Sequence, residues 1–173
     1  LSEVRTLTEI TGKNTNVSSI SPISGNDRLI RIVLAGSPVE SIMDVLALEN
    51  LEYINVDSSK IFPAEVPEIL LQRPKLTIIY RTTELNSWWT AIDPAWQGIF
   101  RKQFEMGEEP SEDQLHRMTS VSSLSFQSLS IGDISPLTIF VNLRSLTIFD
   151  SPLGSILPVA ELTLLEKLTI SQV

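Results

Sequence analysis

The sequence contains no cysteine and a single histidine, His116, among its 173 residues. Disulfides, thiolate nucleophiles, Cys–His catalytic pairs and metal sites built from several histidines are therefore excluded. The motifs G-x-S-x-G, G-x-x-x-x-G-K and H-E-x-x-H are absent as well. The acidic run from Glu108 to Asp113 lacks the alternating spacing of a calcium loop. The sequence therefore predicts a protein that is not an enzyme and holds neither a cofactor nor a metal.

Positive charge is also scarce, because 13 Lys and Arg residues against 21 Asp and Glu residues give a net charge of −8. This balance argues against a nucleic-acid partner, which calls for a basic patch, and against an anionic membrane surface. No apolar run approaches the roughly 18 residues of a spanning helix, so no membrane insertion is expected. The chain begins at Leu1 without a methionine or a visible signal peptide and ends within a strand-like pattern. We therefore expect a fragment, or a processed form, of a longer protein.

One phrase is abundant: an apolar residue, any two residues, an apolar residue, any one residue and a third apolar residue. One partial and five complete copies start at Leu7, Leu29, Leu51, Val121, Leu143 and Leu165. The starts lie 22 residues apart from 7 to 51 and again from 121 to 165. This period with this core is typical of a leucine-rich-repeat solenoid, an α/β fold with short parallel strands. Apolar strand residues face inward, and stacking of the repeats builds the core.

The likeness between repeats continues beyond the strands. The segments VSSISPI (17–23) and IGDISPL (131–137) occupy the same place in two distant repeats. On these residues, the sequence resembles the 22-residue type of leucine-rich repeat found in bacterial surface proteins, over most of the chain except about 85–120. The resemblance implies a binding module that recognises another protein through an extended concave surface, in the cell envelope of a bacterium or outside the cell.

The sequence departs from that family at the position where an asparagine usually forms a ladder between repeats. The residues found there are Thr15, Ser37, Ser59, Leu129 and Ser151. Serine and threonine hydroxyls bond to turn backbone groups more weakly than asparagine, and a leucine side chain does not bond to them at all. We therefore expect an irregular turn, or a local register slip, after Phe126.

A segment of a different kind separates two repeat arrays. The predicted parts are a first array at 1–84, a helical Trp-bearing cap or linker at 85–120, and a truncated second array at 121–173. Helical spacing of apolar residues, an Asp93–Pro94 start and a Ser111–Gln114 capping box predict a pair of helices in the middle part. The segment also resembles the lead-in of repeats in surface proteins of Bacteroidetes-type bacteria. A weaker repeat, Leu76-x-x-Ile79 with Arg81 in the third place, is expected to end the first array.

Candidate partner-binding residues follow from the alternation of side chains along a strand, because residues between the core positions project from the concave face. Tyrosine and arginine are common anchors at protein interfaces. The candidates are Arg31, Tyr53, Asn55, Asp57, Tyr80, Gln127, Thr147 and Phe149. The simpler alternative is that these are solvated strand residues without a partner.

Two other functions remain open at the level of sequence. Trp88 and Trp89 are adjacent and would form an aromatic platform for a glycan, although such a pair more often plugs the end of a core. The chain would otherwise serve as a scaffold or targeting domain of a larger protein.

Overall fold

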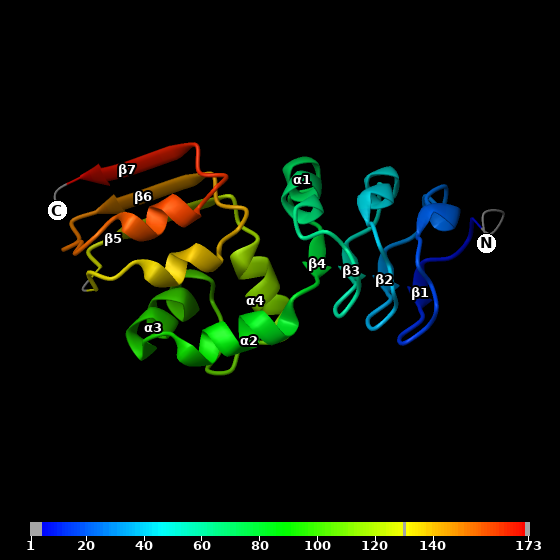
Figure 1. The fold of residues 1–173 in the computed structure, drawn as a ribbon, viewed down its shortest axis with the longest axis horizontal. Helices are drawn as coiled ribbons and strands as arrows, with labels where there is room; N and C mark the ends of the chain where they lie inside the picture. The colour runs from blue at the N-terminus through cyan, green and yellow to red at the C-terminus, as the bar shows by residue number, and fades with distance from the viewer. Residues whose placement is uncertain (1–4, 130, 172–173) are drawn as a thin grey trace. The chain divides into compact units, whose positions relative to one another are not determined.

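The structure of the chain is a computed structural model that describes residues 5–129 and 131–171. The chain divides into two compact units, Leu1–Thr83 and Glu84–Val173, and each is built on a parallel sheet of its own (Figure 1). The first sheet has the strand order β1-β2-β3-β4 and the second has the order β5-β6-β7. Strands that follow one another in sequence are neighbours in each sheet, as in a solenoid of stacked repeats.

The strands of the first unit are short and regularly spaced. They are β1 (Glu9–Thr11), β2 (Arg31–Val33), β3 (Tyr53–Asn55) and β4 (Thr77–Ile79). The return segments contain the 3-10 turns η1 (Ser21–Ile23) and η2 (Met43–Ala47) and the helix α1 (Glu65–Gln72). Ile10, Ile32, Ile54 and Ile78 form one row across the sheet. This row points into a core whose buried side chains are isoleucine, leucine and valine.

The second unit adds helices to the same plan. Its strands are β5 (Ser123–Gln127), β6 (Ser145–Phe149) and β7 (Lys167–Ser171), with the 3-10 turns η3 (Ser135–Ile139) and η4 (Leu157–Glu161). Before the strands come the helices α2 (Thr82–Ala91), α3 (Pro94–Gln103) and α4 (Glu112–Thr119). Leu124, Leu146 and Leu168 lie in register, 22 residues apart. The predicted α/β solenoid with short parallel strands is confirmed.

Two of the helices begin where the sequence predicts. The Asp93 side chain accepts a hydrogen bond from the Ala95 amide at the start of α3, and Ser111 and Gln114 form a capping box at the start of α4. The helix α2 was missed, because its first turn has no local cap signal. Instead the Asp57 carboxylate, 25 residues upstream, accepts a hydrogen bond from the Thr82 amide at 2.9 Å.

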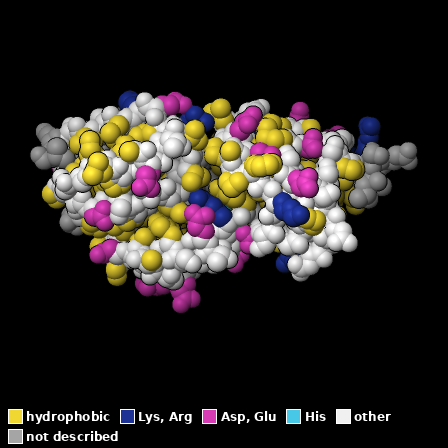
Figure 2. Space-filling model, viewed as in Figure 1, with side chains coloured by type: hydrophobic (Ala, Val, Ile, Leu, Met, Phe, Trp, Pro, Cys, Tyr) yellow, Lys and Arg dark blue, Asp and Glu magenta, His cyan; other side chains and the backbone are white. Residues whose placement is uncertain are grey.

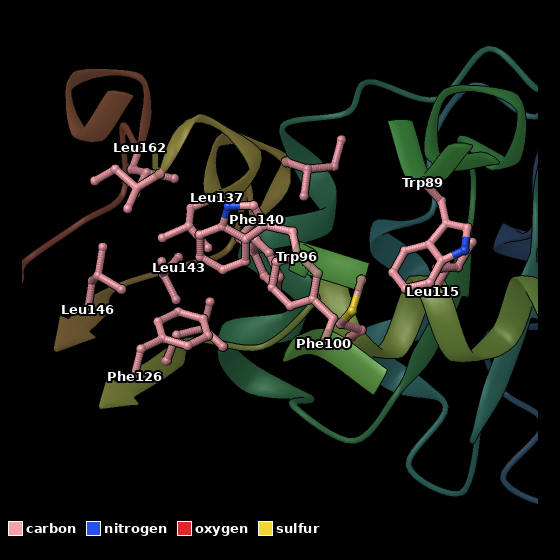
Figure 3. Packing of buried hydrophobic residues seen from close by; sticks show 14 of the residues in the cluster. Trp89, Trp96, Phe100, Leu115, Phe126, Leu137, Phe140, Leu143, Leu146 and Leu162 are labelled. Carbon is pink, nitrogen blue, oxygen red and sulfur yellow. The ribbon is translucent and has the colours of Figure 1, made fainter. Parts of the chain in front are cut away.

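The core of the second unit is aromatic where that of the first is aliphatic. The rings of Trp96 and Phe100 stack with centroids 5.1 Å apart, and Phe126 and Phe140 close around them (Figure 3). Side chains of α2, α3 and α4 share this core with the strands β5 and β6. Residues 85–120 therefore pack as part of the second unit. The three-part division at 84/85 and 120/121 itself stays a prediction.

The last repeat of the first unit differs from the prediction by one residue. Tyr53 pairs with Thr77, so β4 follows β3 after 24 residues, and Ile78 rather than Ile79 continues the core row. A shift of one residue exchanges the two faces of a strand. Tyr80 consequently packs against the aliphatic core, and Ile79 lies on the opposite face. The placement of Tyr80 on the concave face was therefore wrong.

A left-handed residue follows the strands β1, β2, β3, β5 and β6 at one fixed place in the repeat. Positive φ angles occur at Asn14, Gly36 and Ser58 in the first unit and at Ser128 and Asp150 in the second. A Cβ at Gly36 would also lie 2.1 Å from Oδ1 of Asn14, so the side chain of Asn14 would have to move to admit one. Asparagine, glycine and aspartate tolerate this conformation better than other residues, which accounts for three of the five positions.

Hydroxyl groups join adjacent repeats beside these turns. Oγ of Ser37 accepts the amide of Thr15 at 3.1 Å, and Oγ of Ser151 accepts the amide of Leu129 at the same distance. The turn after Phe126 therefore matches the others, and the register of β5 and β6 is unbroken. The expectation of an irregular turn was wrong, because the hydroxyl that accepts the Leu129 amide belongs to Ser151 of the following repeat.

Candidate functional site

The outer face of each sheet, defined here as the face opposite the core, is where the sequence places the candidate residues. In the first sheet, many side chains on this face are covered by contacts with one another. The guanidinium of Arg31 lies 3.7 Å from the centre of the Tyr53 ring and 3.7 Å from a carboxylate oxygen of Glu9. Tyr53 is only 9% exposed and packs in a small cluster with Val33 and Ile79. The ring of Tyr53 is thus not the open anchor that was expected.

Two further candidates of the first sheet accept hydrogen bonds from backbone amides. Oδ1 of Asn55 accepts a hydrogen bond from the Asp57 amide at 3.0 Å, which closes the turn after β3. The carboxylate of Asp57 holds the first turn of α2, as described above. With Tyr80 facing the core, Arg31 is the candidate of this sheet that best keeps the predicted position. One oxygen, Oδ1, of each of Asn55 and Asp57 is thus engaged in the fold, and their role as contact residues stays a prediction.

The outer face of the second sheet is open and polar. Along β5, Leu124 and Phe126 are buried, whereas Ser123, Ser125 and Gln127 are exposed. Across the three strands, the outward residues are Ser123, Ser125, Gln127, Ser145, Thr147, Phe149, Lys167, Thr169 and Ser171. Lys167 carries the only formal charge in this set. The face therefore offers hydroxyl and amide groups in a regular array with little charge.

One aromatic side chain interrupts this polar array. Phe149 is 37% exposed at the end of β6, in register with Gln127 on one side and Ser171 on the other. Thr147, on the same strand, is half-buried between Ser125 and Thr169. The structure thus brings Gln127, Thr147 and Phe149 together on adjacent strands, as the sequence predicted for their positions.

A groove borders this face along β5. It has a volume of about 390 Å³ and is lined by Ile99, Lys102, Gln103, Ser125, Phe126, Gln127, Ser128 and Leu129. The side-chain amide of Gln103, in α3, donates a hydrogen bond to the carbonyl of Ser125, with 3.4 Å between nitrogen and oxygen. Sequence reasoning missed the contribution of α3, because the packing of a helix beside a strand edge is a tertiary property without a local signal.

Trp88 and Trp89 do not form an exposed platform. Trp89 is 8% exposed, and the guanidinium of Arg101 lies 5.6 Å from its ring centre. Trp88 is half-buried, and its ring centroid lies 5.8 Å from that of Phe100 and 6.5 Å from that of Phe140. Their aromatic area is used mainly to close the core, which the sequence favoured over the exposed platform that it left as an alternative.

Other kinds of site receive no support in the part of the chain that the structure describes. Within residues 5–129 and 131–171, no three His, Cys, Asp or Glu side chains are grouped so as to hold a metal ion. Over the same residues, no helix combines the length and apolar character needed to cross a bilayer. On the face drawn in Figure 2, lysine and arginine side chains lie scattered among acidic ones rather than in a basic patch.

Comparisons with known proteins find similar solved structures, and the three described here are from Listeria monocytogenes. No protein-family profile and no curated protein sequence matches the chain. An internalin, InlF, of Listeria monocytogenes is 18% identical with a TM-score of 0.40, over 97% of this chain and 48% of that one. Internalin C2 of the same species is 14% identical with a TM-score of 0.41, over 98% of this chain and 73% of that one. The functional domain of InlJ from Listeria monocytogenes, which includes a cysteine ladder, is 17% identical with a TM-score of 0.36, over 99% of this chain and 31% of that one.

The chain therefore spans about half the length of the first of these proteins and less than a third of the last. The likeness of residues 85–120 to Bacteroidetes-type proteins stays a prediction. The fold class rests on features of the chain itself: the 22-residue register of β1 to β3 and of β5 to β7, the inward rows of apolar residues, and the left-handed residue that follows β1, β2, β3, β5 and β6. These features give the chain the fold of a leucine-rich-repeat solenoid.

Proposed function

We propose that this chain is a non-enzymatic module for protein recognition and that its binding site is the outer face of the second sheet. The observation that carries the proposal is the position of Phe149. An aromatic ring that is 37% exposed stands at the end of a polar strand face, between Gln127 and Ser171. Aromatic anchors surrounded by polar groups are typical of interface hot spots.

The neighbouring groove supports the same location. It shares Gln127 and Ser125 with the strand face and adds the apolar side chain of Ile99 and the cation of Lys102. A partner that covers Phe149 and extends into the groove would therefore meet apolar surface, hydrogen-bonding groups and one charge within a continuous area. The outer face of the first sheet offers less, because Tyr53 is covered by Arg31 and its own cluster. Arg31 stays a predicted contact residue of that sheet.

The location in the cell belongs to the same proposal. We place the module in the envelope of a bacterial cell or outside the cell, on the resemblance of its 22-residue repeats to those of bacterial surface proteins. The role of scaffold or targeting domain in a larger protein stays a second prediction, and it is compatible with the same fold.

A glycan is the second candidate ligand, and the specific observation in its favour is the hydroxyl- and amide-rich outer face. Six of the nine outward residues of the second sheet are serine or threonine, one is Gln127 and one is aromatic. Sugars bind to such polar groups and to aromatic faces. This candidate uses Phe149 and Gln127 rather than the buried tryptophan pair.

The test is a matched pair of substitutions. Phe149→Ser removes the anchor, and Val141→Ser removes an apolar side chain of the same 37% exposure outside the strands of the unit. Immobilised wild-type chain is incubated with surface-protein extracts from bacterial and host cells, and on a glycan array. We expect a protein ligand whose affinity falls at least about tenfold in Phe149→Ser and is unchanged in Val141→Ser. Equal binding by all three chains would contradict the proposed site, and binding to glycans alone would select the second candidate.

A further inference from the structure

We propose that the second unit carries another binding site, a cavity that accepts the cationic side chain of a lysine or arginine presented by a peptide. The cavity has a volume of about 290 Å³ and lies between the segment joining α2 to α3 and the segment that leads into η3. Its lining residues are Trp88, Ala91, Ile92, Asp93, Trp96, Ile131, Asp133, Ser135 and Pro136. None of them belongs to a strand, so this site is separate from the outer face of the sheet and does not rest on the function proposed for it.

The walls of the cavity are aromatic and aliphatic. Trp96 is buried and held in place on two sides: it stacks on Phe100, and its Nε1 donates a hydrogen bond to the carbonyl of Asp133 at 2.9 Å. Trp88, Ile92 and Ile131 add further apolar surface. Such walls suit the methylene stem of a long side chain, and indole rings attract a cation near their faces.

The charge of the cavity is negative and uncompensated. Asp93 and Asp133 are the charged lining residues, and neither forms an ion pair within the described ranges 5–129 and 131–171. Hydrogen bonds fix both carboxylates without neutralising them. Oδ1 of Asp93 accepts from the Ala95 amide at 2.7 Å, and Asp133 accepts from the amide and hydroxyl of Ser135, each at 2.8 Å. A cation entering the cavity would therefore meet acceptors that are already in position.

The same inventory disfavours other ligands. An anion would face two carboxylates, and the hydrogen-bond donors of Ser135 are already directed at Asp133. A volume of 290 Å³ is at the lower limit of small-molecule sites, which are commonly about 300–1,000 Å³. The cavity therefore fits one long side chain better than a cofactor or an oligosaccharide.

A polypeptide is favoured as the carrier of the cation because of the exposure of the two carboxylates. Asp93 and Asp133 are exposed, so the cation of a Lys or Arg side chain can reach them from a backbone that stays outside the cavity. The occupant we infer is therefore an extended basic segment of a partner protein, with one Lys or Arg side chain inserted.

The experiment uses the full chain and two tripeptides, acetyl-Gly-Lys-Gly-amide and the analogue with norleucine in place of lysine. The indole N–H resonances of Trp88 and Trp96 report on the cavity walls and are followed by NMR during titration. We expect a saturable shift with the lysine peptide that weakens as salt is added, and none with the norleucine peptide. Equal shifts with both peptides, or no saturable shift with the lysine peptide, would overturn the proposal.

The variant Asp93→Asn/Asp133→Asn provides the second arm. Asparagine is also a good N-cap and keeps the side-chain oxygen that accepts backbone amides, so the fold is retained while both charges are removed. Asp150→Asn is the control, since Asp150 is exposed and outside the cavity. We expect at least tenfold weaker lysine-peptide binding in the double variant and wild-type binding in the control. Unchanged binding in the double variant, with unchanged indole resonances in the free protein, would overturn the role of the carboxylates.

Discussion

The two sheets follow the same repeat but present different outer faces. In the first, Arg31 covers the ring of Tyr53, and Asn55 and Asp57 bond to backbone amides. In the second, the outward serine and threonine residues are exposed or half-buried, and the ring of Phe149 is exposed. The inward residues thus determine the solenoid, whereas the outward residues are free to vary and decide whether a face is closed or available for binding.

The cores differ as well. Isoleucine, leucine and valine fill the first core, and four aromatic rings dominate the second. The helix α3 supplies Trp96 and Phe100 to that core, and α2 and α4 add further buried side chains. The first strand of the second sheet is therefore covered by helix side chains rather than by another repeat. The predictions below test these contrasts by substitution.

The largest effect is expected from Phe100→Ala. Phe100 is fully buried and contacts the rings of Trp96, Phe126 and Phe140. Its removal should lower the free energy of unfolding of the second unit by about 3–5 kcal/mol, since a large cavity replaces the ring. Urea denaturation combined with hydrogen exchange of the β5 and β6 amides measures this loss. A loss under about 1 kcal/mol would show that the aromatic cluster is not the core.

The position of a repeat within its array should matter almost as much. Leu146 in β6 is 0% exposed, whereas Leu168, its counterpart in β7, is 39% exposed. Leu146→Ala should therefore cost about 2–5 kcal/mol of unfolding free energy, and Leu168→Ala less than about 1.5 kcal/mol. Equal losses in urea denaturation would mean that Leu168 is covered in solution.

A smaller difference is expected between the two hydroxyl ladders. Ser151→Ala leaves the buried amide of Leu129 without an acceptor, which should cost about 1–3 kcal/mol. Ser37→Ala removes the hydroxyl that accepts the amide of Thr15. This amide is half-exposed, so water can replace the acceptor, and the loss should cost about 0.5–1.5 kcal/mol. The midpoints of urea unfolding measure both values, and the reverse order would disprove the assigned roles.

The smallest effect concerns the closed face of the first sheet. The contact of Arg31 with Tyr53 should contribute about 0.5–1 kcal/mol, and the ion pair with the exposed Glu9 should add little. A double-mutant cycle of Arg31→Met and Tyr53→Leu isolates the coupling energy. A coupling near zero would mean that Tyr53 is free to move, and the outer face of the first sheet would then be available for binding.

The sequence predicted the parts of the fold that depend on regular spacing. The rows through Ile32 and Ile54, and through Leu124 and Leu146, follow from the 22-residue period, and Asp93 and Ser111 mark their helix starts locally. The same reasoning fails at β4, because β4 follows β3 after 24 rather than 22 residues, and Tyr80 therefore faces the core.

The candidate site was less predictable, because it depends on contacts distant in sequence. Alternation along the strand places Phe149 and Gln127 on the outer face, and the structure agrees. The alternation pattern does not reveal that Asp57 bonds to the first turn of α2, that Trp89 is buried, or that α3 forms a groove beside β5. Each of these facts requires knowledge of which segments pack together.

The most direct test of the account is photo-crosslinking from single positions on the two outer faces. A p-benzoyl-phenylalanine is introduced in place of Phe149, Arg31 or Val141, and the protein is irradiated on cells that produce or contact it. The account predicts a discrete crosslinked protein from position 149 and none from position 141. Crosslinks from position 31 alone would contradict it and transfer the recognition site to the first sheet.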